Sequence, residues 1–80
     1  MTDKDKELDL KGLKCPLPAL FAKRALAKAQ PGERLVVVAD DPMAAIDVPH
    51  MCRQEGYAVV SLSRNGDVSR MVLERPATNT

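Results

Sequence analysis

The spacing of the apolar residues changes several times along this chain, and the order of these changes constrains the fold most. Apolar residues alternate over residues 7–11, follow a helical spacing over 16–29, and form a nearly uninterrupted run over 34–39. Alternation is typical of a half-buried strand, and apolar residues three or four positions apart are typical of an amphipathic helix. A short β-branched run is typical of a central strand. The pattern therefore predicts a strand, a helix and a second strand.

A second helix is expected over residues 43–55, and Pro49 is awkward there because proline disrupts a helix interior. We expect a loose turn over 43–46 and a main helix capped by Asp47, so that Pro49 falls in its first turn. One continuous kinked helix is the alternative. Gly56 ends this segment in either case.

Two further strands are expected over residues 57–63 and 68–75, joined by the sequence Arg-Asn-Gly-Asp. Asn65 and Gly66 tolerate the positive φ angles of a type I′ hairpin turn. The resulting order is β-α-β-α-β-β, in which the first three strands are parallel and the hairpin adds an antiparallel fourth. Two helices can cover only one face of such a sheet. The predicted fold class is therefore α/β (α+β), a two-layer sandwich with a four-stranded mixed sheet.

The core of this sandwich lies between the sheet and the two helices. From strand alternation and the helical stripe, we expect it to contain Leu8, Leu10, Phe21, Leu26, Val60, Leu62, Met71 and Leu73. In the second strand, either Leu35 and Val37 or Val36 and Val38 point outward.

The chain has 80 residues and a formal net charge of +1. This length suits one domain, expected over residues 7–75, with flexible tails at 1–6 and 76–80. The near-neutral charge argues against direct nucleic-acid binding. The start of the chain has no apolar signal segment, and the longest apolar run is too short to span a membrane. We therefore expect a cytoplasmic protein whose two cysteines stay reduced.

Cys15 lies between Lys14 and Pro16, and Pro18 follows three residues after the thiol. If the helix starts at Pro16, Cys15 occupies the N-cap, and both prolines fall in the first turn, where they do no harm. The positive end of the helix dipole and Lys14 would then both favour the thiolate. The pattern predicts a nucleophile, although most free cysteines are buried packing residues.

Several chemistries are disfavoured for this thiol. A dithiol site of the C-x-x-C type needs a cysteine where Pro18 stands, and a cysteine hydrolase needs a base, for which only His50 is available. His50 and Cys52 do not share a helix face, so a metal site is not expected either. No cofactor is expected. A thiolate without a resolving cysteine or a base can still accept and pass on a group, which indicates a carrier.

The segment Leu-Asp-Leu-Lys-Gly-Leu-Lys-Cys-Pro-Leu-Pro-Ala-Leu (residues 8–20) resembles the TusA/SirA-like sulfur carriers. So do the later stretches Pro-Gly-Glu, Ala-Asp-Asp-Pro and Ile-Asp-Val-Pro. The similarity covers residues 8–75 and centres on a Cys-Pro-x-Pro motif. One departure is Met51, at a position where the family often has a large aromatic residue. The resemblance implies the same two-layer sandwich, with strand order 1-2-4-3.

The resemblance also implies a function. Such carriers are sulfurtransferases that accept sulfane sulfur as a cysteine persulfide from a cysteine desulfurase or another sulfurtransferase. They pass this sulfur to a downstream acceptor protein, as in tRNA 2-thiolation or sulfur metabolism. Carried over to this chain, the persulfide forms on Cys15, and Pro16 and Pro18 shape its loop. The sequence names neither the donor nor the acceptor.

Asp40 and Asp41 follow the second strand, and parallel neighbouring strands end at the same edge of a sheet. Both carboxylates are therefore expected near Cys15. Capping of the second helix is the favoured structural role. Partner docking is the functional alternative.

The first helix has a basic outer face with no acidic residue of its own. Lys23 and Arg24 are candidates for partner docking, whereas Lys28 is favoured as a solvated residue. Two rival functions remain. One is a noncatalytic regulatory or RNA-binding module, supported only by this basic face. The other is a redox sensor that uses Cys15 and Cys52 together.

Overall fold

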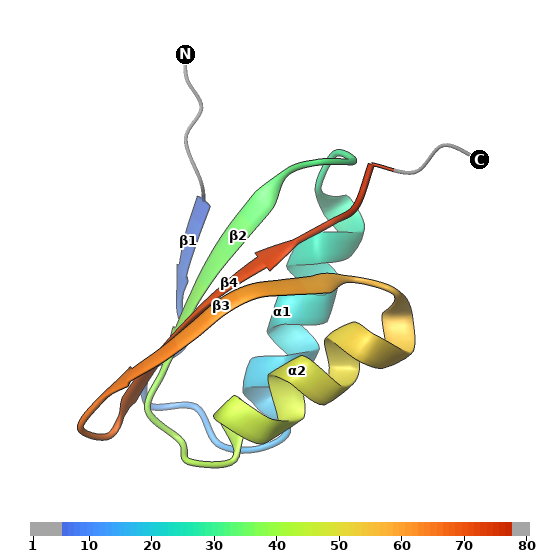
Figure 1. Cartoon of the computed structure of the whole chain (residues 1–80). Coiled ribbons are helices and arrows are strands. Elements are labelled where there is room, and N and C mark those ends of the chain that lie inside the picture. The colour runs from blue at the N-terminus through green and yellow to red at the C-terminus, as the bar shows by residue number, and fades with distance from the viewer. Residues whose placement is uncertain (1–5, 78–80) are drawn as a thin grey trace.

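The computed structural model describes residues 6–77 and contains six regular elements (Figure 1). They are β1 (Lys6–Asp9), α1 (Leu17–Lys28), β2 (Arg34–Ala39), α2 (Ala44–Glu55), β3 (Ala58–Asn65) and β4 (Val68–Glu74). This is the β-α-β-α-β-β order that the apolar spacing predicts. The expected N-terminal tail included Lys6, which instead begins β1. The remainder of that tail and residues 78–80 lie outside the described residues.

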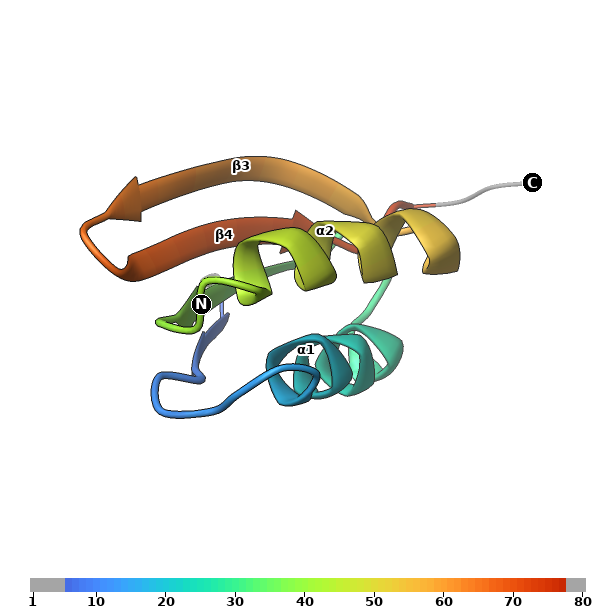
Figure 2. The same ribbon diagram turned by 90° about the horizontal axis from the view of Figure 1, so that it is seen from below.

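The four strands form one mixed sheet in the order β1-β2-β4-β3. β1 pairs with β2 in parallel, and β4 is antiparallel to both β2 and β3. The first three strands therefore run in the same direction, as predicted. Both helices lie on the same side of the sheet (Figure 2), which confirms the two-layer sandwich. Neither helix of the described residues has the length and apolar character needed to cross a membrane.

The core lies between this sheet and the helices. Leu35 and Val37 of β2 belong to the core cluster, so Val36 and Val38 are the outward pair. Four of the predicted core residues are buried: Leu10, Leu26, Met71 and Leu73. Leu8 and Phe21 are half-buried and pack against this cluster.

Val60 and Leu62 were expected in the core, and both expectations are wrong. Val60 is 44% exposed and Leu62 40% exposed. The ladder between β3 and β4 is irregular between Val59 and Ser61, which shifts the alternation of side chains along β3. β3 is also an edge strand with a single neighbour, so its side chains receive less cover than those of β2 and β4.

α2 continues through Pro49, so the predicted loose turn with Asp47 as the cap is wrong and the continuous helix is correct. The helix is preceded by Met43, whose carbonyl accepts hydrogen bonds from the N–H groups of Ile46 and Asp47 at 3.0 and 2.7 Å. Four side chains of α2 are buried: Ala44, Val48, Met51 and Cys52. Packing of this face outweighs the cost of an internal proline, because tertiary packing supplies most helix stability.

The hairpin turn is displaced by one residue from its predicted centre. Asn65 pairs with Val68, which leaves Gly66 and Asp67 as the two loop residues. Gly66 has a φ of 64°, a left-handed conformation that glycine adopts without steric cost. Asn65 is instead the last residue of β3.

Candidate functional site

The loop that follows β1 and the loop that follows β2 meet at one edge of the sheet (Figure 1). The backbone N–H of Gly12 donates to Asp40 Oδ1 at 2.9 Å, and that of Cys15 donates to Asp41 Oδ2 at 2.6 Å. These contacts arise because β1 and β2 are parallel neighbours whose carboxyl ends share an edge. The prediction that both aspartates lie near Cys15 is confirmed.

Cys15 does not occupy the N-cap of α1, contrary to the prediction. The helix begins at Leu17 and its N-cap is Pro16, so the thiol lies one residue earlier. The N–H of Leu17 donates to the carbonyl of Lys14 at 2.8 Å, which closes a turn around Cys15 and Pro16. Pro18 is the second residue of the helix and is buried, at a position where a missing N–H costs nothing.

Asp41 joins the two loops through Oδ2 and holds its own loop through Oδ1. Besides the bond from Cys15, its Oδ1 accepts from the N–H of Met43 at 3.4 Å. Its side chain is not the cap of α2, because the N-cap residue of that helix is Met43, which makes no capping hydrogen bond through its own side chain. The predicted capping role is therefore wrong. Asp41 is 8% exposed, and this burial favours a structural role over partner docking.

A third carboxylate, which the sequence did not assign to the site, lies closest to the thiol. Cys15 Sγ donates a hydrogen bond to Asp47 Oδ2 at 2.6 Å. Asp47 is in the first turn of α2 and is 32 residues away in the sequence. Helical periodicity could not reveal this contact. The only signal was the Ile-Asp-Val-Pro stretch of the family resemblance, which contains Asp47.

These carboxylates reverse the predicted electrostatics of the thiol. The hydrogen bond to Asp47 raises the pKa of Cys15, and desolvation and the negative charges of Asp47 and Asp41 act in the same direction. A nearby negative charge disfavours the thiolate. Lys14 was expected to favour the thiolate, but the groups that shift the pKa of Cys15 are the two carboxylates, and both raise it. The site therefore disfavours the activated thiolate that the sequence predicts.

The second cysteine is in a different environment. Cys52 is fully buried in the core, whereas Cys15 is exposed. Burial raises the pKa of Cys52 to about 11. Cys15 is therefore the only thiol of the chain that a partner can reach. Within residues 6–77, no three His, Cys, Asp or Glu side chains are grouped so that they could bind a metal ion.

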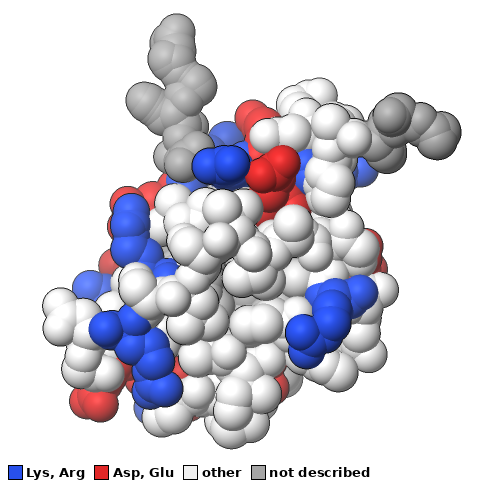
Figure 3. All heavy atoms as spheres, in the orientation of Figure 1, with Lys and Arg blue, Asp and Glu red and all other residues white. Residues whose placement is uncertain are grey.

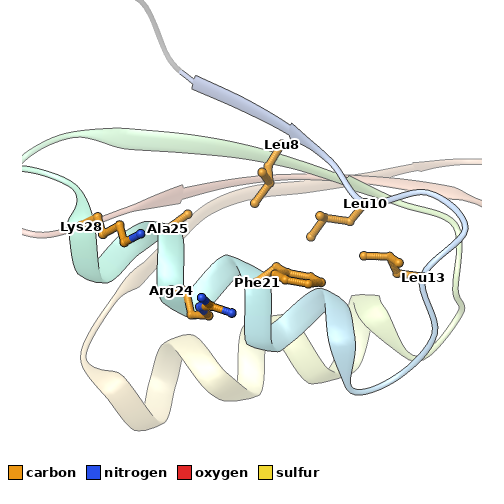
Figure 4. Close-up of a pocket in the computed structure, with 7 residues that line it drawn as sticks. All are labelled: Leu8, Leu10, Leu13, Phe21, Arg24, Ala25 and Lys28. Carbon is orange, nitrogen blue, oxygen red and sulfur yellow. The ribbon is translucent and has the colours of Figure 1, made fainter.

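The basic face of α1 is divided between two environments. Lys23 Nζ lies 3.3 Å from Glu55 Oε2 of α2, so this cation has an acidic partner outside its own helix. Arg24 and Lys28 instead line a cavity of about 430 Å³ between α1 and β1 (Figure 4). The remaining lining residues are apolar: Leu8, Leu10, Leu13, Phe21 and Ala25. Arg24 thus places a positive charge beside an apolar surface.

Large apolar side chains are exposed at the beginnings of both helices, near the residues that hold the thiol. Leu17 and Leu20 of α1 are 38% and 46% exposed, and Met43 and Ile46 at the start of α2 are 43% and 61% exposed. Exposed apolar groups gathered in one region are typical of an interaction surface. On the face shown in Figure 3, basic side chains occur at several separate places rather than as one continuous patch.

Comparisons with known proteins agree with this fold and identify the family. Residues 6–75 match the family model described as sulfurtransferase TusA. The chain belongs to the TusA family. Two proteins of Neisseria meningitidis, from serogroups A and B, are each named "putative sulfur carrier protein". Each is 45% identical to this chain over 67 residues, which cover 84% of this chain and 90% of the relative.

A solved structure shows the same architecture. The SirA-like protein from Desulfitobacterium hafniense matches with a TM-score of 0.75 and 25% sequence identity, over 88% of this chain and 96% of that protein. The two helices and the mixed sheet of order 1-2-4-3 are therefore those of a SirA-like fold. The resemblance inferred from the Cys-Pro-x-Pro segment is confirmed. At the level of the family, this TusA-family chain is a sulfur carrier.

Proposed function

We propose that this chain is a sulfurtransferase that carries sulfane sulfur as a persulfide on Cys15. The observation that supports this most is the contrast between its two thiols. Cys15 is exposed on a loop held by Asp41, whereas Cys52 is buried in the core. A single reachable thiol can accept one sulfur atom and pass it on, without forming an internal disulfide.

The donor in this proposal is a cysteine desulfurase or another sulfurtransferase, and the acceptor is a downstream protein. The persulfide sulfur then serves tRNA 2-thiolation or another branch of sulfur metabolism. Free thiols persist in a reducing cytoplasm, which is where we place this protein. No bound cofactor is required, because the sulfur itself is the cargo.

Both partners must reach the thiol, and the surface around it suits protein contacts. Leu17, Leu20 and Ile46 expose apolar side chains at the beginnings of the two helices. Arg24 adds a positive charge along α1. Apolar contacts would supply affinity, and charges at the rim would increase the rate of association. Lys14 and Asp40, next to the thiol loop, belong to the same docking surface.

Intact-protein mass spectrometry tests the proposal directly. The reduced protein is incubated with a cysteine desulfurase, pyridoxal phosphate and L-cysteine, and its mass is then measured without reductant. The wild type should gain the mass of one sulfur atom, and Cys15→Ser should gain none. Loss of two hydrogen atoms would instead indicate a Cys15–Cys52 disulfide and a redox sensor. An unchanged mass would favour a noncatalytic binding module.

A further inference from the structure

The hydrogen bond between Cys15 and Asp47 presents a chemical problem for a carrier. The Sγ to Oδ2 distance is 2.6 Å, and the thiol is the donor. Sulfur transfer needs the thiolate, because the thiolate and not the thiol is the nucleophile. The proton that leaves Sγ therefore needs an acceptor, and the nearest hydrogen-bonded one is the Asp47 carboxylate.

We infer that Asp47 is a catalytic residue, which accepts the thiol proton of Cys15 when that thiol attacks the persulfide of a donor. This inference rests on the proposed sulfur-carrier function. It assigns Asp47 a role that differs from that of Asp41. Asp41 contacts the backbone N–H of Cys15 and positions the loop, whereas Asp47 contacts the reacting sulfur atom itself.

The charged groups around the thiol support this assignment. Asp41 is the second carboxylate whose charge acts on the thiol, and it is already engaged by two backbone N–H groups. Asp40 accepts a bond from Gly12 on the same loop. Lys14 is exposed and forms no salt bridge with the described residues. No other side chain of residues 6–77 forms a hydrogen bond with Sγ.

The proposed step balances without an external oxidant or reductant. The proton of Cys15 Sγ moves to Asp47 Oδ2, and the thiolate attacks the terminal sulfur of the donor's R–S–SH group. A new S–S bond forms to Cys15 while the donor's S–S bond breaks, and the donor leaves as the thiolate R–S⁻. The leaving thiolate takes up one proton, and Asp47 releases one to water. Cys15 ends as Cys15–S–SH and the donor as R–SH.

This role has a signature that a purely structural role lacks. As a nearby negative charge, Asp47 disfavours the free thiolate, so Asp47→Asn should lower the pKa of Cys15. Alkylation by iodoacetamide, which needs only the thiolate, should then be faster near neutral pH. Loading from a protein persulfide should nevertheless be slower, because a docked protein donor keeps water away from the thiol, so the proton must pass to residue 47, and the amide cannot accept it. The two rates are expected to change in opposite directions.

The experiment compares wild type, Asp47→Asn and Asp67→Asn in the full chain. Asp67 lies in the β3–β4 turn and is exposed, so its variant makes the same change of charge away from the thiol. The pH dependence of iodoacetamide alkylation and the rate of sulfur loading from a cysteine desulfurase are measured for each. Asp47→Asn should shift the alkylation profile to lower pH and slow loading by about 100-fold, a typical general-base effect. Asp67→Asn should match wild type in both.

Each result decides the inference. Faster loading in Asp47→Asn, in step with faster alkylation, would mean that Asp47 only suppresses the thiolate, and loading at the wild-type rate would mean that it is not needed. Either outcome overturns the inference while leaving Cys15 as the carrier. If Asp47→Asn does not fold, Asp47→Glu retains a carboxylate and should keep more loading activity than Asp47→Ser; equal loading in these two variants contradicts the inference. Loading of Cys15→Ser would instead contradict the proposed function.

Discussion

Asp41 Oδ2 accepts a hydrogen bond from the backbone N–H of Cys15 at 2.6 Å, although the two residues are 26 positions apart in the chain. This contact joins the loop after β1 to the loop after β2. The position of the thiol therefore depends on the parallel pairing of β1 with β2. The motif contains the thiol of Cys15, and a residue of another segment, Asp41, fixes the position of its backbone.

Asp41→Ala should destabilise the fold and slow sulfur loading together. The substitution leaves the N–H groups of Cys15 and Met43 without their acceptor. A hydrogen bond to a charged group contributes about 1.5–3 kcal/mol, and urea denaturation can measure the loss of these two partly buried bonds. Asp40→Ala is the matched control. Because Asp40 is less buried and accepts a single bond from Gly12, its substitution should cause a smaller loss of stability. Equal losses of stability would argue against a special role for Asp41.

The two cysteines should respond differently to substitution by serine. Cys15→Ser should abolish persulfide loading with little loss of stability, because the side chain is exposed. Cys52→Ser should retain loading but destabilise the core, since an unpaired buried hydroxyl costs about 1–3 kcal/mol. Mass spectrometry of the loaded protein checks persulfide loading, and chemical denaturation checks stability. Equal loss of loading in both variants would exclude a single-thiol carrier.

The buried thiol should also make stability depend on pH. Burial raises the pKa of Cys52 from 9.0 to about 11, so the folded state retains its proton at a pH where the unfolded state has lost it. The contribution of Cys52 to stability is thus complete below about pH 9 and is lost as the pH rises through about 11.

The measurement is the free energy of unfolding of wild type and Cys52→Ala at pH 8 and at alkaline pH. Other groups titrate in this range in both proteins, so the difference between the two isolates Cys52. The wild type should lose more stability than Cys52→Ala as the pH rises. Parallel curves would show that this thiol does not ionise on unfolding.

The order of the elements could be predicted from the sequence because each one carries its own local signal. The β-branched run at residues 34–39 matches the bounds of β2, and the Gly66 turn connects β3 to β4. The strand order came from the family resemblance, since apolar spacing alone does not say which strands are neighbours. Local signals failed at Pro49, where packing of α2 onto the core outweighs the preference of one residue.

The electrostatics of the site could not be predicted, because its decisive contacts are tertiary. The sequence places Lys14 beside Cys15 and predicts a thiolate, whereas folding brings Asp47 from α2 to 2.6 Å from the sulfur. Val60 and Leu62 failed for a related reason. Strand alternation predicts on which face of the sheet each side chain lies. It does not encode the irregularity in β3 or the position of β3 at the sheet edge.

Arg24 is the cation of α1 that we expect to guide partner docking. Lys23 was an equal candidate, but it pairs with Glu55, so reversing its charge would also place two carboxylates together. Arg24 lines the apolar cavity between α1 and β1 and forms no salt bridge within the described residues. Arg24→Glu should therefore slow sulfur loading from a protein donor while leaving alkylation of Cys15 by iodoacetamide unchanged.

Salt dependence separates a docking charge from a solvated one. Exposed charges are screened over about 8 Å at physiological ionic strength, so wild-type loading should slow as salt is raised and Arg24→Glu should respond less. Arg64→Glu is the matched control, because Arg64 is an exposed cation on β3, outside α1 and its cavity. It should keep the wild-type rate and salt response. If Arg24→Glu also keeps both, Arg24 belongs to a solvated helix face, and donor docking depends on the apolar side chains around the thiol.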